Sequence, residues 1–422
     1  MRDIDAHENL LRTMFAAAVA RARPDICVPM HLPEPPRGRT IVVGAGKAAA
    51  SMAQAVEKHW PTPLEGVVVT RYGHALPCRR IDVLEAGHPI PDEAGVVAAH
   101  RLFAAVSNLT VNDLVLCLLS GGGSALLAAK PPGITLAEER ALTSALLRSG
   151  ARIGEMNMVR RKISLIRGGG LAAAAAPARI VTLAISDVPN DDPLAIASGP
   201  TVPDSAAPRD ALAILRRYGI APPPGVTRWL DRPAAKSAPR PPAEIDYRIV
   251  ANARDALEAS ASAAMDFGLA PHILGDAIEG EAREVAEAHA GAARQAAERG
   301  ETSLFLSGGE TTVTVRGEGR GGRNAEYLLA LGLSLANRSD VWALAADTDG
   351  IDGSEDNAGA VWTPDTLARA RERGLDPETH LAHNDAYRFF AKLDQLVVTG
   401  PTRTNVNDFR AMLVAPQRLR LQ

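Results

Sequence analysis

Short apolar runs alternate with longer segments of helical periodicity through the first half of the chain. The apolar runs occupy residues 40–43, 67–70, 114–119 and 180–185. Each run has the length of a buried strand, and strands that alternate with helices are typical of a parallel sheet covered by helices. Ahead of them, residues 9–22 form an alanine-rich amphipathic pattern that predicts a helix. The first half of the chain is therefore predicted to be an α/β domain.

The same alternation resumes after a proline-rich interval at residues 221–243. Proline cannot continue a helix or a central strand, so this interval predicts a domain boundary. We therefore predict the fold class α/β, with two α/β domains at residues 1–235 and 243–422. Each domain is expected to have a largely parallel sheet flanked by helices, with the active-site cleft between them and the first helix free to pack on the other domain. Strands of the second domain are expected at residues 247–251, 272–274, 303–306, 313–315, 341–345 and 395–398.

Composition and charge are those of an ordinary globular protein. Of the 422 residues, 46% are hydrophobic, and the formal net charge is −3. This balance gives no electrostatic support for a nucleic acid or an anionic membrane as a partner. The three cysteines lie far apart without a C-x-x-C pair, which argues against structural zinc and a disulfide framework. Because no signal peptide or membrane span is recognisable, we expect a cytoplasmic protein, and base rates favour a homodimer.

The tripeptide Ser-Gly-Gly follows an apolar run in each half of the chain, at residues 120–122 and 307–309. Glycine directly after a strand permits a left-handed turn whose backbone N–H groups can approach an anion. Tight turns that need glycine for their shape alone are the competing interpretation. The candidate cofactor-binding residues of these two segments are Ser120, Gly121, Gly122, Gly123, Ser124, Ser307, Gly308, Gly309 and Glu310.

A glycine-rich segment, Gly44-Ala45-Gly46-Lys47, also joins the first predicted strand to a helix. It has the form of a dinucleotide-binding fingerprint, but Arg71 stands where an acidic residue is expected after the next strand, which leaves at most NADP open. It is not a Walker A loop, because no Ser or Thr follows Lys47. Gly44 and Gly46 remain candidates for nucleotide binding, and Lys47 at a helix N-terminus is a candidate phosphate ligand. A surface lysine at a helix start is the alternative.

Two arginine-containing segments supply further candidate anion ligands. Arg323 and Asn324 follow a glycine-rich turn and begin a predicted helix. Arginine can grip phosphate or carboxylate through two parallel hydrogen bonds. In the other segment, Arg160, Ser164 and Arg167 share one face of a predicted helix. A solvated basic face is equally compatible with this spacing.

Carboxylates cluster immediately after the strand predicted at residues 341–346, where Asp349 and Asp352 lie in a glycine-rich loop. Open α/β sheets bind ligands beyond the carboxyl ends of their strands, and Mg²⁺ prefers oxygen ligands. An EF-hand calcium loop is excluded, because its fifth and twelfth positions would be Ile351 and Ala358. Asp349 and Asp352 are therefore candidate Mg²⁺ ligands, and a solvated acidic turn is the alternative.

Two other strand ends carry polar side chains that suit a ligand. Asp187 follows the strand at residues 180–185 and could ligate a cation or orient a hydrogen-bond donor. The segment after the last predicted strand carries several hydroxyl and amide groups. Its residues Arg403, Asn405 and Asn407 are candidates for holding a small polyhydroxylated acid, although a capped helix start explains the segment equally well.

Taken together, these motifs resemble those of the class II glycerate 2-kinases over nearly the whole chain. That family combines an N-terminal Rossmann-like domain with a C-terminal MOFRL domain. The resemblance is carried by GAGKAAASM at residues 44–52, AGHPIPDE at 86–93, LSGGGSALL at 119–127, NMVRRKIS at 157–164, ISDVPNDDPLAIASGPTVPD at 185–204, SGGETTV at 307–313, GGRNAEYLLAL at 321–331, DTDGIDG at 347–353 and TGPTRTNVND at 399–408.

The resemblance implies an ATP-dependent kinase that phosphorylates D-glycerate at its 2-hydroxyl, giving 2-phosphoglycerate and ADP. It also implies Mg²⁺ or a similar divalent cation. By position, Lys47 and Arg323 match the cations that the family is proposed to use in its cleft. Arg403 departs from the family pattern, which often has glycine there.

These considerations give a set of predicted roles. The catalytic candidates are Lys47, Arg323, Asp187 and Asp349, the metal candidates are Asp187, Asp349 and Asp352, and the substrate candidates are Arg160, Arg403, Asn405 and Asn407. Two alternatives remain open: an NAD(P)H-dependent hydroxypyruvate reductase, a name also given to members of this family, and a noncatalytic sugar-acid-binding protein. The missing acidic residue after Thr70 argues against the reductase.

Overall fold

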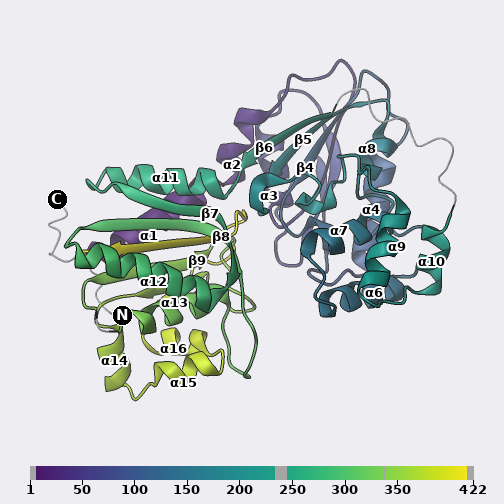
Figure 1. Ribbon diagram of the computed structural model, residues 1–422. Helices are drawn as coiled ribbons and strands as arrows, with labels where there is room; N and C mark the ends of the chain where they lie inside the picture. Colours follow the sequence, from purple (N-terminus) through teal and green to yellow (C-terminus); the bar gives the residue numbers. More distant parts are fainter. Residues whose placement is uncertain (1–5, 233–244, 337, 416–422) are drawn as a thin grey trace. The chain divides into compact units, whose positions relative to one another are not determined.

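The computed structural model describes residues 6–232, 245–336 and 338–415 (Figure 1). The chain divides into two compact units, which we describe separately. The N-terminal unit consists of Pro24–Val250, and the C-terminal unit combines Met1–Arg23 with Ala251–Gln422. The predicted boundary at residues 235–243 lies outside the described residues. The first helix is grouped with the C-terminal unit, the alternative that the sequence left open.

A six-stranded sheet forms the centre of the N-terminal unit, with the strand order β3-β2-β1-β4-β5-β6. All pairings from β3 through to β5 are parallel, as predicted from the alternation of apolar runs and helices. The prediction missed β3 and assigned β6 to the other domain. The strands are β1 (Thr40–Ala45), β2 (Glu65–Arg71), β3 (Ile81–Ala86), β4 (Leu114–Leu119), β5 (Arg179–Ile185) and β6 (Ile245–Ala251).

Helices cover this sheet, and one apolar core joins several of them to it. Helices α3 and α4 both pack against β1, β2 and β3, and α3 also packs against β4. The core includes Val43 and Cys117 of the strands and Leu102 and Leu171 of the helices. The helices concerned are α2 (Pro24–Cys27), α3 (Ala49–His59), α4 (Glu93–Ala105), α5 (Gly123–Leu126) and α8 (Gly170–Ala175), and the short 3₁₀ turns are η1 (Pro29–His31), η2 (Pro189–Asp191) and η3 (Ile196–Ser198).

Four helices form a smaller cluster with an apolar core of its own. Leu142, Val159, Leu215 and Leu230 contribute to this core. At the start of the first of these helices, Thr135 accepts from a backbone N–H and forms a capping box, which fixes where the helix begins. The helices are α6 (Leu136–Arg148), α7 (Ile153–Lys162), α9 (Pro208–Arg217) and α10 (Pro224–Leu230).

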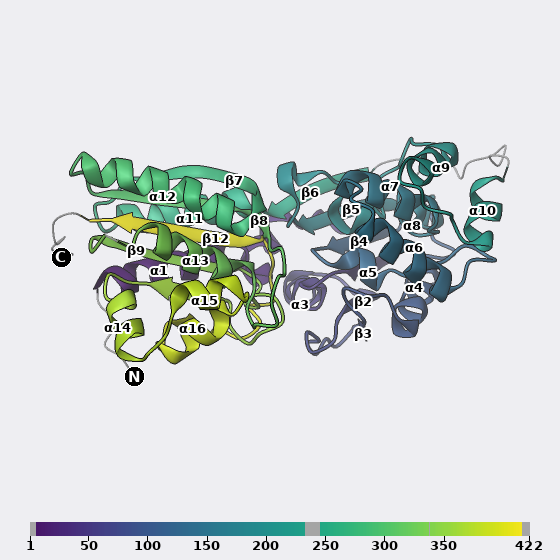
Figure 2. The ribbon, with the colours of Figure 1, turned by 60° about the horizontal axis from the view of Figure 1, so that its bottom comes forward.

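The C-terminal unit contains a second six-stranded sheet, with the order β11-β10-β9-β12-β8-β7. Only the β7–β8 pair is parallel in the described part of this sheet, so the prediction of a largely parallel second sheet is wrong. The last strand inserts antiparallel between β8 and β9 (Figure 2), and β10 runs antiparallel to both of its neighbours. The strands are β7 (Pro271–Glu281), β8 (Ser303–Thr312), β9 (Val341–Asp347), β10 (Gly359–Trp362), β11 (Leu396–Val397) and β12 (Asp408–Val414).

Helices lie on both faces of the second sheet. Helices α1 and α11 pack together on one face, and α12 and α13 pack together on the other (Figure 1). The strand predicted at residues 313–315 does not form. The helices are α1 (Ala6–Arg21), α11 (Ala253–Met265), α12 (Ala282–Glu298), α13 (Arg323–Ser334), α14 (Thr366–Glu372), α15 (Pro377–Ala382) and α16 (Ala386–Lys392).

The predicted α/β fold class is confirmed, since each unit has a sheet flanked by helices. Among the described residues, no helix combines the length and the apolar character that crossing a membrane requires.

Candidate active site

Two glycine turns meet where the strand order of the N-terminal sheet reverses, at the carboxyl ends of β1 and β4. Ligands of open α/β sheets bind at such a point. A Cβ on Gly44 would lie 2.3 Å from Leu118 O, and one on Gly46 would lie 2.1 Å from Ser120 Oγ. These glycines therefore let β1 and its turn pack onto β4. In a dinucleotide fingerprint, by contrast, the second glycine leaves room for the pyrophosphate.

Lys47 is tied to the second turn through its backbone. Its N–H donates to Gly121 O at 2.8 Å, and the next N–H, of Ala48, donates to Ser120 Oγ at 2.9 Å. Ser120 is fully buried, so it joins the two turns rather than facing a ligand. The Lys47 side chain is partly exposed, and its Cγ lies 3.4 Å from the Cβ position of Gly122.

The imidazole of His88 lies against the same glycine. Gly122 has a φ of 80°, and a Cβ there would lie 2.9 Å from His88 Nε2. A side chain at this position would therefore be strained and would also meet the imidazole. The side chains of Lys47 and His88 are both partly exposed. They thus approach Gly122 from two different loops.

A pair of hydroxyl groups follows the glycine turn. Ser124 Oγ lies 2.7 Å from Ser198 Oγ, and a Cβ on Gly123 would lie 2.7 Å from the Cβ of Ala197. Ala197 and Ser198 have left-handed φ values of 50° and 60°. Such strain in residues other than glycine persists only where the surroundings enforce it, and it clusters at functional sites. The η3 turn is therefore held in a costly conformation against the glycine turn.

Two arginines and one glutamate lie next to this turn. Arg167 donates from NH2 to Ser124 O at 2.7 Å and forms an ion pair with Glu139 at 3.2 Å. Burial and the charge of Arg167 lower the pKa of Arg160 to about 10, although Glu139 acts in the opposite direction. The predicted single helical face is wrong, because α7 ends at Lys162, before Ser164.

Asp187 follows β5, which pairs with β4, so it lies at the same edge of the sheet as the glycine turn. It is partly exposed. This places a carboxylate within the N-terminal unit on the side where Lys47 and Ser124 lie.

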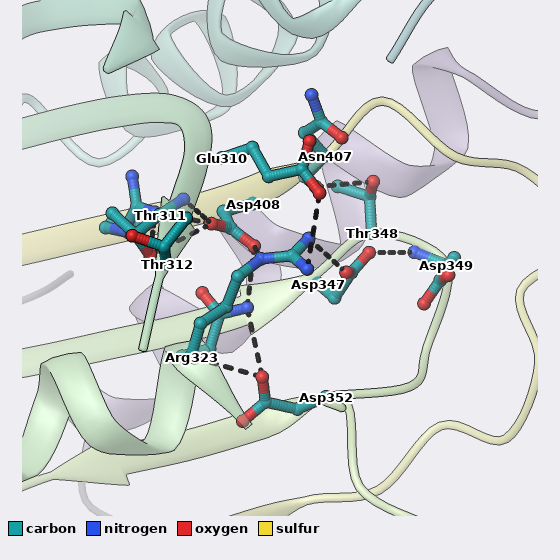
Figure 3. Close-up of polar contacts among 12 residues, drawn as sticks. Glu310, Thr311, Thr312, Arg323, Asp347, Thr348, Asp349, Asp352, Asn407 and Asp408 are labelled. Carbon is teal, nitrogen blue, oxygen red and sulfur yellow. Dashed lines mark hydrogen bonds and ion pairs between the residues drawn. The ribbon is translucent and has the colours of Figure 1, made fainter. Parts of the chain in front are cut away.

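In the C-terminal unit, Arg323 lies between carboxylates (Figure 3). Its Nε donates to Asp408 at 2.8 Å, and its NH2 donates to Asp347 at 2.7 Å. Glu310 lies 3.5 Å from NH1. Burial alone would lower the pKa of the guanidinium, but the charges of Asp408, Asp347 and Glu310 outweigh it and raise the pKa. The positive charge of Arg323 is thus matched within its own unit.

Asp352 stabilises the start of helix α13. Its two carboxylate oxygens accept from the backbone N–H groups of Asn324 and Ala325, at 3.0 and 2.9 Å. Burial raises the pKa of Asp352 to about 6, against the lowering effect of these two hydrogen bonds. Because Asp352 is completely buried and caps a helix, the structure does not support it as a metal ligand. Asn324 is equally buried, and its side-chain amide donates to Asp408 at 2.7 Å.

Asp349, the other metal candidate of the C-terminal unit, is also hydrogen-bonded within its own loop. Asp349 is buried, and its Oδ1 accepts from the backbone N–H of Ile351 at 2.9 Å. Across residues 6–232, 245–336 and 338–415, no three Asp, Glu, His or Cys side chains are grouped so that they could hold a metal ion. A protein-only cage for Mg²⁺ is therefore not formed by the described residues.

The second Ser-Gly-Gly segment is not a turn. Ser307, Gly308 and Gly309 lie inside β8, which pairs with β12 on one side and with β7 on the other. A Cβ on Gly309 would lie 2.2 Å from Ile278 O, so glycine is needed for the irregular pairing with β7. The prediction of an anion-binding turn at residues 307–309 is wrong. Glu310 follows in the same strand, half-exposed beside Arg323.

The predicted substrate residues after β11 lie in a tightly bonded loop. Asn405 and Asn407 are buried, and the Asn405 side chain accepts from the Asn407 N–H at 3.2 Å. Thr348 donates to Asn407 O at 2.7 Å. Arg403 is partly exposed, with a left-handed φ of 67°. The two asparagines therefore order this loop, and Arg403 presents the more reachable side chain.

Comparison with known proteins identifies the family. The domain of unknown function DUF4147 matches residues 10–231, and the MOFRL family matches residues 303–408. A D-glycerate 2-kinase of Thermotoga maritima is 36% identical over 97% of this chain and 98% of its own length. The chain belongs to the class II glycerate 2-kinase family.

Members of the glycerate 2-kinase family also share its structure. The crystal structure of glycerate kinase from Thermotoga maritima superposes with a TM-score of 0.87 and 36% sequence identity, covering 96% of this chain and 99% of that one. A protein of Agrobacterium vitis with the provisional name hydroxypyruvate reductase is 53% identical over 98% of this chain and 95% of its own length. Both names that the motifs suggested are thus found among the relatives.

The structure adds residues to which the sequence gave no role. Asp408 and Arg410 pair with each other, and Thr311 donates its N–H to Asp408 at 3.2 Å. His88 and Asp408 both lie in motifs that carry the family resemblance, and that was the available signal. No sequence motif indicated a role for Glu139, because its burial results from tertiary packing.

Proposed function

We propose that the protein is an ATP-dependent kinase that phosphorylates D-glycerate at the 2-hydroxyl, giving 2-phosphoglycerate and ADP. The observation that carries the proposal is the similarity to the D-glycerate 2-kinase of Thermotoga maritima over 97% of the chain. The cations and hydroxyl groups at the switch point of the N-terminal sheet support it, since both reactants are anions. Phosphoryl transfer depends mainly on positioning the reactants and stabilising the charge that they develop.

Lys47 is the residue that we propose acts on the transferring phosphoryl group. It lies in the turn that begins α3, and its Cγ lies 3.4 Å from the Cβ position of the left-handed Gly122. Groups that are held in place before the reaction stabilise developing charge without reorganising. The imidazole of His88 lies near the same Cβ position, with its Nε2 at 2.9 Å.

Asp187 is the carboxylate that we propose orients the 2-hydroxyl and accepts its proton. It lies after β5, at the edge of the sheet that carries Lys47 and Ser124. A general base must come within hydrogen-bond reach of the proton that it accepts. Asp349, the other catalytic candidate, is buried and accepts a backbone hydrogen bond in its own loop, which favours Asp187.

ATP is proposed to bring Mg²⁺ with it. Mg²⁺ usually keeps several waters and binds through substrate phosphates and one or two carboxylates. We assign no described residue to the ion. We further propose that the reaction takes place in the cytoplasm and that the protein is a dimer.

A hydroxypyruvate reductase is the second candidate, favoured by the provisional name of the Agrobacterium vitis relative. Two observations argue against it. The space beside Gly44 and Gly46 is filled by Leu118 and Ser120, and β2 ends in Arg71 rather than in an acidic residue. A dinucleotide therefore lacks both the glycine space and the ribose ligand of the usual fingerprint.

One assay separates the candidates. The purified protein is incubated with ATP, MgCl₂ and D-glycerate, and ADP release is followed with a coupled enzyme. Phosphorus NMR of the product then distinguishes 2-phosphoglycerate from 3-phosphoglycerate. We expect ADP and 2-phosphoglycerate. Oxidation of NAD(P)H by hydroxypyruvate without ADP release from D-glycerate would favour the reductase, and D-glycerate binding without either reaction would indicate a binding protein.

A further inference from the structure

Three consecutive basic residues lie in the last turn of helix α7, and their hydrogen-bond and ion-pair partners differ. Arg161 and Lys162 form ion pairs with Asp204, at 2.8 and 3.1 Å. The guanidinium of Arg160 has only a long contact, 3.5 Å, with the amide oxygen of Asn157 in the described part of the chain. Its Nε is buried there without a hydrogen-bond partner. Arg160 thus keeps its charge without the carboxylate that its neighbours have.

The surroundings of Arg160 carry a surplus of positive charge. Arg167 is buried beside it, and Glu139 is the carboxylate that pairs with Arg167. Two guanidinium groups therefore lie near one carboxylate. Burial lowers the pKa of Arg160 most, and the charge of Arg167 lowers it further. Arg167 Nε and Glu139 Oε2 are also buried without partners among the described residues. Buried charge is costly unless it is paired, so an additional anion would stabilise this group.

The position of Arg160 relative to the glycine turn is fixed by Arg167. The Arg167 guanidinium donates from NH1 to Arg160 O at 3.3 Å and from NH2 to Ser124 O at 2.7 Å. One planar group therefore connects the end of α7 with the end of the glycine turn. Arg160 itself remains partly exposed, although its Nε is buried.

We propose that Arg160 binds the carboxylate of the hydroxy-acid substrate and thereby selects the 2-hydroxyl for phosphorylation. The selection of the 2-hydroxyl rests on the proposed kinase function. The binding of a hydroxy acid by Arg160 does not depend on it. Lys47 approaches the turn at Gly122, and Arg167 holds it at Ser124, two residues further on. In D-glycerate the 2-hydroxyl is on the carbon next to the carboxylate, whereas the 3-hydroxyl is one carbon further away. Anchoring the carboxylate at the Arg160 end therefore limits which hydroxyl reaches the phosphoryl group near Lys47.

The test compares Arg160→Gln and Arg160→Lys with the wild type. Arg148→Gln is the matched control, because Arg148 is an exposed arginine in the last turn of the neighbouring helix α6. Four quantities are measured: the KM for D-glycerate, the KM for ATP, the ratio of 2- to 3-phosphoglycerate by phosphorus NMR, and the calorimetric Kd of D-glycerate without nucleotide.

For Arg160→Gln we expect the KM and the Kd for D-glycerate to rise on the order of 10²-fold, the loss expected for a hydrogen-bonded charge. The KM for ATP should stay within about twofold, and 3-phosphoglycerate should appear among the products. Arg160→Lys should lie between the wild type and Arg160→Gln, and it carries the test if the glutamine variant does not fold. The control should match the wild type.

The proposal is overturned if both substitutions leave the KM and Kd for D-glycerate unchanged and the product purely 2-phosphoglycerate. It is also overturned if the KM for ATP rises in parallel with that for D-glycerate, because this would indicate a general disturbance of the site. Failure of the kinase function is a separate result: the wild type would then release no ADP with D-glycerate. In that case the calorimetric comparison still decides whether Arg160 holds the carboxylate.

Discussion

The two Ser-Gly-Gly segments have the same sequence and different structures. Residues 120–122 follow the last residue of β4 and turn into α5, with Gly122 in a left-handed conformation. Residues 307–309 lie within β8, between β7 and β12. In the first segment the glycines form a turn at the edge of a sheet, and in the second they allow a neighbouring strand to approach. A glycine pattern after an apolar run therefore indicates that another group packs closely against the backbone. Whether that group is a neighbouring strand or a ligand decides the function of the glycines.

The charges around the two segments differ in the same way. In the C-terminal unit, Arg323 is matched by Asp347 and Asp408, and the guanidinium of Arg410 also pairs with Asp408. In the N-terminal unit, Arg160 lacks such a partner among the described residues. An arginine or lysine near glycines is thus a candidate anion site only where the fold leaves its charge unmatched. Substitutions in each of the two units test this contrast.

The largest effect is expected from Arg323→Ala. Removing the guanidinium takes a cation away from the buried Asp347 and leaves Arg410 as the cation of Asp408, which should cost about 3–5 kcal/mol of unfolding free energy. Arg320→Ala is the control, because its pair with Glu355 is exposed at the arginine and should be worth about 1 kcal/mol or less. Urea unfolding measures both. If Arg323→Ala is as stable as the control but loses turnover, the guanidinium acts on the substrate instead of holding this cluster.

Lys47→Ala should reduce turnover at saturating ATP on the order of 10²-fold or more, as expected for a residue that stabilises the charge of the transition state. The unfolding free energy should change little, because the Lys47 side chain is partly exposed. Lys58→Ala, in the last turn of the same helix, is the control. Turnover close to that of the wild type in Lys47→Ala would remove this lysine from the mechanism.

The pH dependence of stability should report Asp352. Its pKa of about 6 in the folded protein lies above the ordinary value of about 3.9. The folded state therefore holds the proton more tightly, so this contribution is complete below pH 4 and is lost as the pH rises through 6. The expected slope between these values approaches about 1.4 kcal/mol per pH unit. Urea unfolding of the wild type and Asp352→Asn between pH 4 and 7 measures it, and equal slopes would show that Asp352 does not titrate in this range.

The smallest effect is expected from a pair of glycine substitutions. Gly122 and Gly133 have similar φ values, 80° and 85°, so alanine strains both backbones by about 1 kcal/mol. A Cβ at Gly122 would also meet His88, whereas nothing lies within 4 Å of one at Gly133. Gly122→Ala should therefore lower turnover beyond the effect of Gly133→Ala. Equal turnover in the two variants would show that the contact with His88 is unimportant.

The parallel sheet was predictable from the sequence because its strands are short apolar runs separated by helices. β1, β4 and β5 were each predicted to within two residues at either end. The glycine turn at residues 120–123 was predictable for the same reason, since it directly follows a recognised strand. Local sequence patterns were sufficient to predict those parts of the structure that depend on residues close together in the chain.

The rest depends on contacts between distant residues. β12 was missed, although it joins β8 to β9, and with it the antiparallel pairing that puts Asp408 beside Arg323, 85 residues earlier. The capping of α13 by Asp352 spans 28 residues and could not be distinguished from a metal-binding loop by composition. The unmatched charge of Arg160 likewise becomes visible only when the partners of Arg161, Lys162 and Arg167 are known.

The central claim is that the glycine turn of the N-terminal unit and the cations beside it hold the reacting anions. Hydrogen–deuterium exchange with and without ATP and D-glycerate tests it most directly. We predict slower exchange in residues 44–52, 119–127 and 157–167 when both substrates are present. Slower exchange confined to residues 303–312 and 347–353, with no change in the N-terminal unit, would contradict the account.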